Sequence, residues 1–446
     1  MTGALNVLAV DLGATSVRVA TVDLDASPPV PRVIHRWPNQ PVRFPDGSLR
    51  WDWPRLMDEI RTGLRLGLEQ GPVASIGIDS WGVDYGLLDG RGELLSAPHS
   101  YRDARTESWL SVVDRIGPQR LYGITGIQLL AVNTIFQLAC HDRDELAAAR
   151  QLLMLPDLVG FQLTGELAAE RSIASTTALL DARTGEWSEE LLDEVGVPPA
   201  VMPPIRSATE RLGSWCGVPV HLTGGHDTAS AVVAIPGDPG AEAAFVSSGT
   251  WVLVGAERGQ VDTSEAARAR NFGNEAGALG GFRFLKNVAG FWLLEACRES
   301  WGNPSVTSLV SAAADVTGPV PTCDALDDRF LAPHDMRAEI CAAAGLPDTA
   351  SPALVTRCIL ESIAATTAAV VEDLAQLSGR HIDQLYVVGG GARIELLNRL
   401  YAKHCEVNVT VGSTEAAALG NALVQGISLG RYAGLSEARQ ALAEAA

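Results

Sequence analysis

The stretch LAVDLGATSVRVATVD, residues 8–23, decides which fold this chain can adopt. Two apolar runs flank a turn of small residues, Gly13-Ala14-Thr15-Ser16, and Asp11 stands near the end of the first run. Short apolar runs separated by turn residues predict a β-hairpin. Its tip is suited to hold a phosphate, because Gly allows a close approach and backbone N–H groups and hydroxyls donate hydrogen bonds.

The same pattern occurs a second time, half a chain away. Residues 244–256 read AFVSSGTWVLVGA, with Ser247-Ser248-Gly249-Thr250 expected in the turn. One hairpin of this kind would mean little. Two copies indicate a duplicated domain, and we expect a nucleotide to bind between the two halves.

Length and charge limit the classes of protein to be considered. A chain of 446 residues exceeds the size at which one hydrophobic core stops growing, so two domains are expected. The hydrophobic content of 47% and the charged content of 20% are typical of a soluble globular protein. A formal net charge of -19 argues against nucleic acid or an anionic membrane as a partner.

Cysteine usage and the N-terminus favour a cytoplasmic protein. The seven cysteines are scattered and form no CxxC pattern, which suits reduced thiols better than disulfides or a zinc site. Asp11 interrupts the first apolar run, unlike a signal peptide. Residues 121–140 carry no charge, but Gln128, Asn133 and Gln137 predict a buried segment facing a cleft and not a membrane-spanning helix.

The remainder of the chain alternates between expected strands and helices. Breaks at 236–240 place a domain boundary between residues 239 and 240, giving domains 1–239 and 240–446. Glycines 389–391 separate an expected strand from an expected helix, which is an arrangement that favours phosphate or a close-packed purine. Periodicity predicts strands at 5–10, 17–22, 75–79, 218–222, 384–388 and 407–411, and helices at 54–70, 357–377, 393–404 and 413–425.

The segment GGHDTAS, residues 224–230, is the strongest candidate for catalysis. It follows an expected strand, and open α/β sheets place ligands at the carboxyl ends of their strands. Asp227 could accept a proton from a substrate hydroxyl during attack on a phosphoryl group. It could equally cap a helix that begins at Thr228, and the spacing alone does not separate the two roles.

Two further residues carry open alternatives. Asp11 beside the first turn could hold Mg²⁺ through water, or it could simply shape the turn. In SWGVDY, residues 80–85, Trp81 could stack on a sugar or belong to the core. Trp251 and Trp292 are expected to be core residues.

Many segments match a known family. They include DLGATS at 11–16, SIGIDSWGVDYGLLD at 75–89, YRDART at 101–106, GGHDTASAV at 224–232, SSGTW at 247–251, NFGNEAG at 271–277, FLKNVAGFWLLE at 284–295 and VVGGGAR at 387–393. In these segments the chain resembles the FGGY carbohydrate kinases of the actin-like ATPase superfamily. The resemblance implies two duplicated α/β domains of the actin-like, ribonuclease H type, with an inter-domain catalytic cleft. It also implies the reaction of ATP with L-rhamnulose to give ADP and L-rhamnulose 1-phosphate.

The resemblance assigns roles residue by residue. Asp227 is implied to be the catalytic base, and Asp11 is implied to hold the Mg²⁺ that accompanies ATP. The residues implied to contact the ketose are Gly82, His226, Asp227 and Thr228. Those implied to contact ATP are Ala14, Thr15, Ser16, Val17, Arg18, Thr250, Asn287, Glu295 and Gly391.

The chain departs from the family pattern on the nucleotide side. Val17 stands where the first loop usually has Gly, Glu295 replaces an expected Gln, and residues 393–395 read Arg-Ile-Glu. Sugar class is therefore better supported than nucleotide preference. Alternatives are a kinase for another ketose, such as L-fuculose or xylulose, and a catalytically silent sugar-binding regulator. A monomer or a homodimer is expected, with only small molecules as partners.

Overall fold

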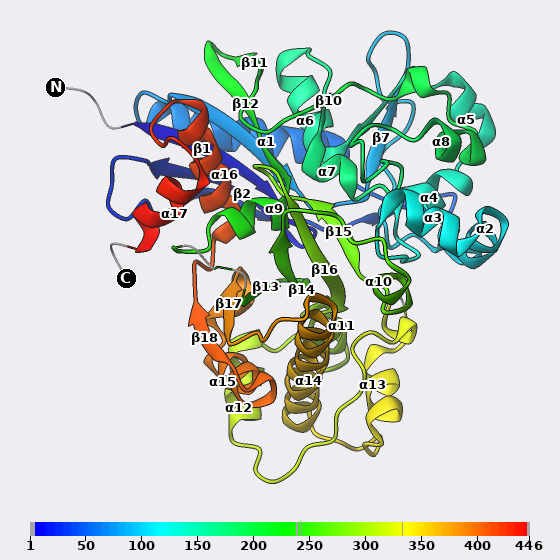
Figure 1. Ribbon diagram of the computed structural model, residues 1–446, viewed down its shortest axis with the longest axis vertical. Coiled ribbons are helices and arrows are strands. Elements are labelled where there is room, and N and C mark those ends of the chain that lie inside the picture. Colours follow the sequence, from blue (N-terminus) through cyan, green and yellow to red (C-terminus); the bar gives the residue numbers. More distant parts are fainter. Residues whose placement is uncertain (1–4, 238–239, 241, 332, 444–446) are drawn as a thin grey trace. The chain divides into compact units, whose positions relative to one another are not determined.

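A computed structural model describes residues 5–237, 240, 242–331 and 333–443, and in it the chain divides into two compact units (Figure 1). The first unit comprises Met1–Asp238, Glu257–Phe284 and Glu415–Ala446, and the second comprises Pro239–Ala256 and Leu285–Thr414. Two segments from the second half of the chain thus belong to the first unit. Residue 239 lies outside the described residues, and the single boundary expected there stays a prediction.

The first unit is built on a six-stranded sheet in the order β11-β12-β6-β1-β2-β3. β1 pairs antiparallel with β2, and β2 pairs antiparallel with β3, whereas β6 lies parallel to both β1 and β12. The predicted first hairpin is therefore confirmed. The strands of this sheet are β1 Asn6–Leu12, β2 Ser16–Asp23, β3 Arg32–Pro38, β6 Ser75–Ser80, β11 Arg211–Trp215 and β12 Val218–His226.

The second unit repeats this strand order. The second sheet has six strands in the order β15-β16-β14-β13-β17-β18, where β15 is Gly273–Ala276. In it β13 is antiparallel to β14 and parallel to β17, and β17 is parallel to β18. A hairpin at the centre of the sheet is thus followed on one side by parallel strands in both units, which confirms the predicted duplication. The strands are β13 Ala243–Ser248, β14 Trp251–Arg258, β16 Phe282–Ala289, β17 Gln384–Val388 and β18 Asn408–Val411.

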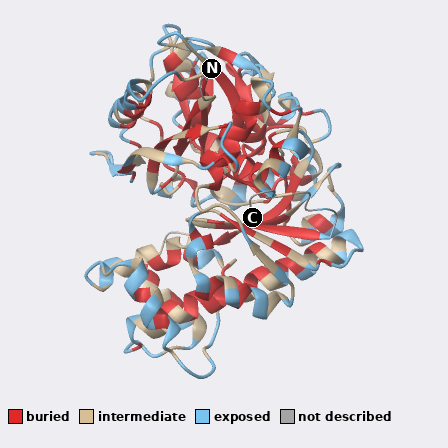
Figure 2. Ribbon diagram, turned by 90° about the vertical axis from the view of Figure 1, so that its left-hand side faces the viewer, coloured by how far each residue is buried: buried red, intermediate tan, exposed pale blue. Residues whose placement is uncertain are grey.

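Helices cover both faces of the first sheet. Successive side chains of a strand point to opposite faces, so the neighbours Leu8 and Ala9 mark the two faces. On α1 (Trp53–Glu69), Gly67 lies against Leu8, so this helix packs on the face that Leu8 presents. On α16 (Ala416–Ser428), Ala418 packs with Ala9 and Ala20 on the other face. The strands are mostly buried, and the helices carry buried and exposed stripes (Figure 2).

The other elements complete the two units. In the first unit they are β4 Val42–Arg43, β5 Leu49–Arg50, β7 Tyr85–Leu88, β8 Gln151–Met154, β9 Ala169–Glu170, β10 Ile205–Arg206, β15 Gly273–Ala276, α2 Trp109–Ile116, α3 Pro118–Thr125, α4 Thr134–Ala139, α5 Arg143–Ala148, α6 Leu155–Thr164, α7 Arg171–Ser175, α8 Glu189–Val195, α9 Asp227–Val233, α10 Glu265–Ala269 and α17 Leu435–Ala443. In the second unit they are α11 Trp292–Ser300, α12 Val306–Ala314, α13 Met336–Ala344, α14 Pro352–Ser378 and α15 Glu395–Cys405.

Two segments that are apolar enough to resemble membrane-spanning helices are parts of the folded units. Residues 121–140 form the end of α3, a loop and α4, and not one continuous helix. Among the described residues α14 alone is long and apolar enough to cross a membrane, and 72% of its apolar window is buried inside the protein. This burial is typical of a core helix.

Most expected elements lie within a few residues of the observed ones. The strand expected at 218–222 continues to His226, and the helix expected from 393 begins at Glu395 after a short 3₁₀ turn, Gly390–Arg393. Both hairpin turns are shorter than expected, because Ser16, Ser247 and Ser248 belong to strands. A strand continues for as long as its backbone can pair with a neighbouring strand, and the local amino-acid composition does not show where that pairing ends.

Candidate active site

Three parallel strands of the first unit end at the same edge of the sheet. Asp11 of β1 lies opposite Asp79 of β6, and Ser80 of β6 lies opposite His226 of β12. Gly82 follows two residues after the end of β6, and Asp227 follows directly after β12. The fold therefore brings Asp11, Gly82, His226 and Asp227 to one edge of one sheet.

An irregularity in β12 precedes Asp227. Leu222 lies opposite Ile78 and His226 opposite Ser80, so β12 contains extra residues between these two pairs. A Cβ atom on Gly225 would lie 2.8 Å from a carboxylate oxygen of Glu170, which explains the glycine there. Such bulges bend a strand and change the direction of the side chains that follow it.

Asp227 is the first residue of α9, and His226 occupies the N-cap position. The interpretation of Asp227 as a helix cap is therefore wrong. Its side chain is 30% exposed, and Thr228 Oγ1 donates to Oδ1 at 3.2 Å. Burial raises the pKa of Asp227 above its ordinary value, the nearby charge of Asp11 raises it further, and His226 acts in the opposite direction.

Glu170 holds the segment that precedes Asp227. Its Oε2 accepts hydrogen bonds from the backbone N–H groups of Gly225 at 2.9 Å and Ser172 at 2.9 Å, and from the Ser172 hydroxyl at 2.5 Å. The Ser172 hydroxyl in turn accepts from the backbone N–H of His226 at 3.2 Å. One buried carboxylate thus ties the start of α7 to the strand that carries His226.

Asp11 is buried and paired across the hairpin. Arg18 Nε donates to its Oδ2 at 2.7 Å, and the same nitrogen lies 3.2 Å from Glu415 Oε2. The turn itself is closed by Gly13 N–H donating to Ser16 O at 3.2 Å, so the interpretation of Asp11 as a turn-former is wrong. Its Oδ1 atom is buried and has no hydrogen-bond partner among the described residues.

Asp79 is a site residue that the sequence analysis missed. It is completely buried, Asn421 Nδ2 donates to its Oδ2 at 2.6 Å, and its Oδ1 finds no partner in the described part of the chain. Burial raises its pKa well above the ordinary value, and the charges of Asp11 and Asp227 raise it further. The sequence did contain a signal for Asp79, because this aspartate ends an apolar run in the same way that Asp11 nearly ends the first one.

The fit to a divalent metal rests on these free carboxylate oxygens. No group of three or more His, Cys, Asp or Glu side chains that could hold a metal occurs within the described ranges. Mg²⁺ requires few protein ligands when it also binds substrate phosphates and water. The unpartnered Oδ1 of Asp11 fits that requirement, although Arg18 occupies the other oxygen.

The loop after β6 is held in a strained conformation. Val83 has φ of 69°, a left-handed value that is an outlier for a β-branched residue. Its N–H donates to Thr176 Oγ1 at 3.2 Å, and its carbonyl accepts from Thr134 Oγ1 at 2.7 Å. Gly82 lies against the same Thr176, because a Cβ atom added to Gly82 would lie 3.1 Å from Thr176 Oγ1.

Of the two roles open for Trp81, the structure favours the core. The side chain is buried, its ring lies 4.4 Å from that of Trp51, and its Nε1 donates to Asp84 at 3.0 Å. Trp251 and Trp292 are half-buried, so the expectation that they are core residues is wrong. Trp292 Nε1 donates to the carbonyl of Phe330 at 3.1 Å.

In the first unit, the candidate phosphate loop lies at the tip of the first hairpin. Ala14 is buried, Thr15 is exposed and Ser16 is half-buried. Val17 is a strand residue whose side chain is fully buried, so only its main chain could face a ligand. At the position where the family usually has Gly, this chain therefore has a valine whose side chain lies in the core.

In the second unit, the tip of the second hairpin contacts two other candidate segments. The carbonyl of Thr250 accepts from the N–H of Trp292 at 3.1 Å, at the start of α11. A Cβ on Gly391 would lie 2.1 Å from Ser248 Oγ, so a larger residue would displace the hairpin. Glu295 on α11 pairs with Arg298, which offsets its negative charge. Asn287 is a half-buried residue of β16.

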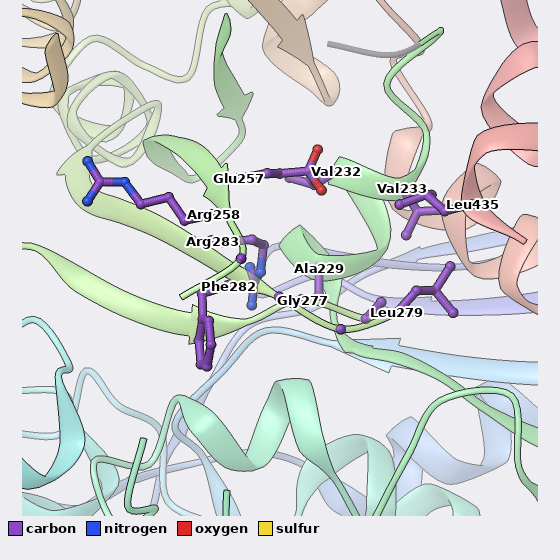
Figure 3. A pocket seen from close by; sticks show the side chains of 14 residues that line it. Ala229, Val232, Val233, Glu257, Arg258, Gly277, Leu279, Phe282, Arg283 and Leu435 are labelled. Atoms are coloured by element: carbon purple, nitrogen blue, oxygen red, sulfur yellow. The ribbon is translucent and has the colours of Figure 1, made fainter. Parts of the chain in front are cut away.

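A cavity of about 200 Å³ lies beside α9 (Figure 3). Ala229, Val232 and Val233 of that helix line it, together with the glycine-containing turn 277–281. None of the residues implied to bind ketose or ATP lines it. Arg283 is shared between this cavity and the surroundings of His226.

Comparison with known proteins identifies the relatives. Residues 6–238 match the N-terminal domain, and residues 244–429 the C-terminal domain, of the "FGGY family of carbohydrate kinases". The chain is 40% identical over 452 residues to "Rhamnulokinase" of Klebsiella pneumoniae (strain 342), covering 97% of this chain and 91% of the relative. It is 39% identical over 455 residues to "Rhamnulokinase" of Yersinia pestis (strain Pestoides F), covering 98% and 93%.

Solved structures share the fold. A gluconate kinase from Lactobacillus acidophilus superposes with a TM-score of 0.80 at 16% identity, covering 98% of this chain and 92% of that one. A ligand-bound xylulose kinase from the same organism superposes with a TM-score of 0.78 at 16% identity, covering 98% and 91%. At such low identity the likeness shows the two-domain α/β fold alone.

Proposed function

Because the chain belongs to the FGGY family of carbohydrate kinases, we propose that it transfers the γ-phosphoryl group of ATP to the 1-hydroxyl group of L-rhamnulose. The products are ADP and L-rhamnulose 1-phosphate. Relatives named rhamnulokinase, 39–40% identical over nearly the whole length, support this substrate. The structural observation that carries the proposal is the position of Asp227, at the sheet edge that also holds Asp11 and Gly82.

In this proposal Asp227 is the general base. The sugar oxygen attacks the γ-phosphorus, the bond from phosphorus to the ADP oxygen breaks, and the proton of the sugar hydroxyl passes to the Asp227 carboxylate. A raised pKa supports this role, because a base accepts a proton more readily as its pKa approaches the working pH. Gly82, His226 and Thr228 complete the ketose contacts.

Contacts with ATP are proposed for residues in each unit. Main-chain N–H groups of Ala14, Thr15, Ser16 and Val17 are proposed to bind phosphate oxygens at the first hairpin. Thr250, Asn287, Glu295 and Gly391 are proposed for the nucleotide in the second unit. When bound with ATP, Mg²⁺ neutralises phosphate charge. The free Oδ1 of Asp11 is proposed to hold it, and Arg18 orients that carboxylate.

The enzyme's partners are a small ketose and ATP, it acts in the cytoplasm as a monomer or homodimer, and it binds neither nucleic acid nor membrane. The net charge of -19 supports the last point, because both of those partners attract basic surfaces.

Exchange of Asp227 for Asn tests the base. The side chain keeps its size but loses its ability to accept a proton, so we expect kcat to fall by at least about a hundredfold. An ADP-release assay with L-rhamnulose, L-fuculose and xylulose measures this and identifies the ketose. Circular dichroism and thermal unfolding confirm that the variant is folded. Near-normal turnover in a folded Asp227→Asn enzyme excludes the assignment.

The same assay separates the alternatives. If kcat/KM is higher for L-fuculose or xylulose than for L-rhamnulose, that ketose and not L-rhamnulose is the substrate. Ketose binding without ADP release from any ketose would favour a sugar-binding regulator.

A further inference from the structure

The imidazole of His226 lies between two buried ionic side chains and Asp227. Its Nδ1 lies 3.0 Å from Glu275 Oε2 and 3.2 Å from Arg283 Nη2, and these two groups lie 3.1 Å apart. The exposed fractions are 6% for His226, 5% for Glu275 and 1% for Arg283. The ring is therefore held from one side by a desolvated ion pair.

The ion pair is anchored in the backbone. Glu275 lies on β15, and Arg283 lies near the start of β16. The Nε and Nη2 atoms of Arg283 also donate to the carbonyl of Ala276, at 3.2 and 3.1 Å. Burying two charges is costly unless they pair and bond well, so an arrangement of this kind has few alternative geometries.

The second ring nitrogen of His226 faces the proposed base. Nε2 lies 3.5 Å from Asp227 Oδ1. The two nitrogens of a histidine are distinct, and the partner of one sets the orientation and protonation of the other. A guanidinium can only donate, so Arg283 Nη2 makes Nδ1 an acceptor, and the proton of the neutral ring then lies on Nε2, which faces Asp227.

We propose that Glu275 is a positioning residue: it holds Arg283 in place, Arg283 donates to His226 Nδ1, and Glu275 thus acts through His226 on Asp227. It holds the imidazole so that Nε2 contacts Asp227 Oδ1 and the ketose hydroxyl in one defined geometry. The inference rests on the proposed function, in which Asp227 is the base. It also gives a role to the segment NFGNEAG, residues 271–277, for which the sequence analysis found none.

A double-mutant cycle tests the route of action. In Glu275→Gln the side chain keeps its shape but loses its charge, and we expect kcat/KM for the ketose to fall between about ten- and a hundredfold, as misplacement of a reacting group does. The KM for ATP should not change. In a His226→Gln background the same exchange should lower kcat/KM by less than about twofold, because its target is already absent.

Glu257→Gln is the matched control. Glu257 also pairs with an arginine in the first unit, Arg439, at 2.7 Å, but it does not contact His226. This variant should retain the ketose kcat/KM. A Glu275→Gln enzyme with wild-type kinetics, or with an equal loss in both backgrounds, would overturn the proposal.

A second measurement is independent of activity. In protein labelled with ¹⁵N-histidine, the Nδ1 and Nε2 signals of His226, identified by their loss in His226→Gln, should shift in Glu275→Gln and not in Glu257→Gln. If wild-type protein phosphorylates no ketose, the proposed function fails, while unchanged signals would reject the positioning role separately. If Glu275→Gln does not fold, the charge-free pair Glu275→Gln/Arg283→Met is measured in its place, and unchanged His226 signals there also reject the role.

Discussion

At the scale of single residues, Asp84 shows how one carboxylate can organise a site without being proposed to contact substrate. Its Oδ2 accepts from Trp51 Nε1 at 2.8 Å and Trp81 Nε1 at 3.0 Å, and its Oδ1 accepts from Gln137 Nε2 at 3.2 Å. These bonds fix both indoles beside the strained Val83. Burial nevertheless raises the pKa of Asp84 to about 6, because hydrogen-bond donors around the carboxylate only partly replace water.

This raised pKa predicts how stability depends on pH. Between the ordinary pKa of 3.8 and about 6 the folded state binds the proton that the unfolded state releases, so the contribution of Asp84 falls as pH rises. Relative to Asp84→Asn, the wild type should lose about 3 kcal/mol between pH 3.5 and pH 7. Urea unfolding of both proteins at each pH measures the difference. Parallel pH profiles would contradict the buried titration.

At the scale of elements, the packing of α16 against α9 depends on one glycine. A Cβ at Gly420 would lie 1.7 Å from the backbone carbonyl oxygen of Ser230, so the two helices could not keep their separation. α16 belongs to the C-terminal part of the chain, yet it packs on the sheet of the first unit. Close helix contact therefore holds a distant segment beside the helix that begins with Asp227.

Gly420→Ala tests this contact. An added methyl group must move backbone atoms, so the free energy of unfolding should fall by about 1–3 kcal/mol. Gly123→Ala in α3 is the matched control, because no atom lies within 4 Å of an added Cβ there. That variant should be neutral or more stable by up to about 1 kcal/mol. Equal stability of both variants in urea unfolding would show that α16 adjusts without cost.

At the scale of the whole molecule, the chain repeats one sheet design and divides the proposed ligand contacts between the two copies. The ketose residues belong to the first unit, and Thr250, Asn287, Glu295 and Gly391 belong to the second. Each unit has buried apolar residues of its own, and most of the apolar window of α14 is buried in the second. A ligand that binds only the native state should stabilise the molecule by RT ln(1 + [L]/Kd), where [L] is the free ligand concentration.

Thermal unfolding should report this linkage. At a hundredfold excess over its Kd, L-rhamnulose should stabilise the protein by about 2.7 kcal/mol and raise Tm accordingly. L-rhamnose, the aldose isomer, is the control and should shift Tm far less. Equal shifts from ketose and aldose would show that the site does not recognise the ketose.

Local patterns were sufficient for the framework of this protein. Both hairpins and the position of Asp227 after a strand follow from short apolar runs and small turn residues, which depend on neighbouring residues alone. The segments around Asp11, Gly82 and Asp227 were sufficient to indicate the FGGY carbohydrate kinases, the family to which the chain belongs.

Tertiary structure decided which residues meet. Asp79 became part of the site through parallel pairing of β1 with β6, and Glu275 reached His226 from a segment about 50 residues away in the sequence. Trp81 was assigned to the core through its contacts with Trp51 and Asp84, not through its type. The physical reason is that burial and pairing set the behaviour of a charge or an aromatic ring, and both depend on distant parts of the chain.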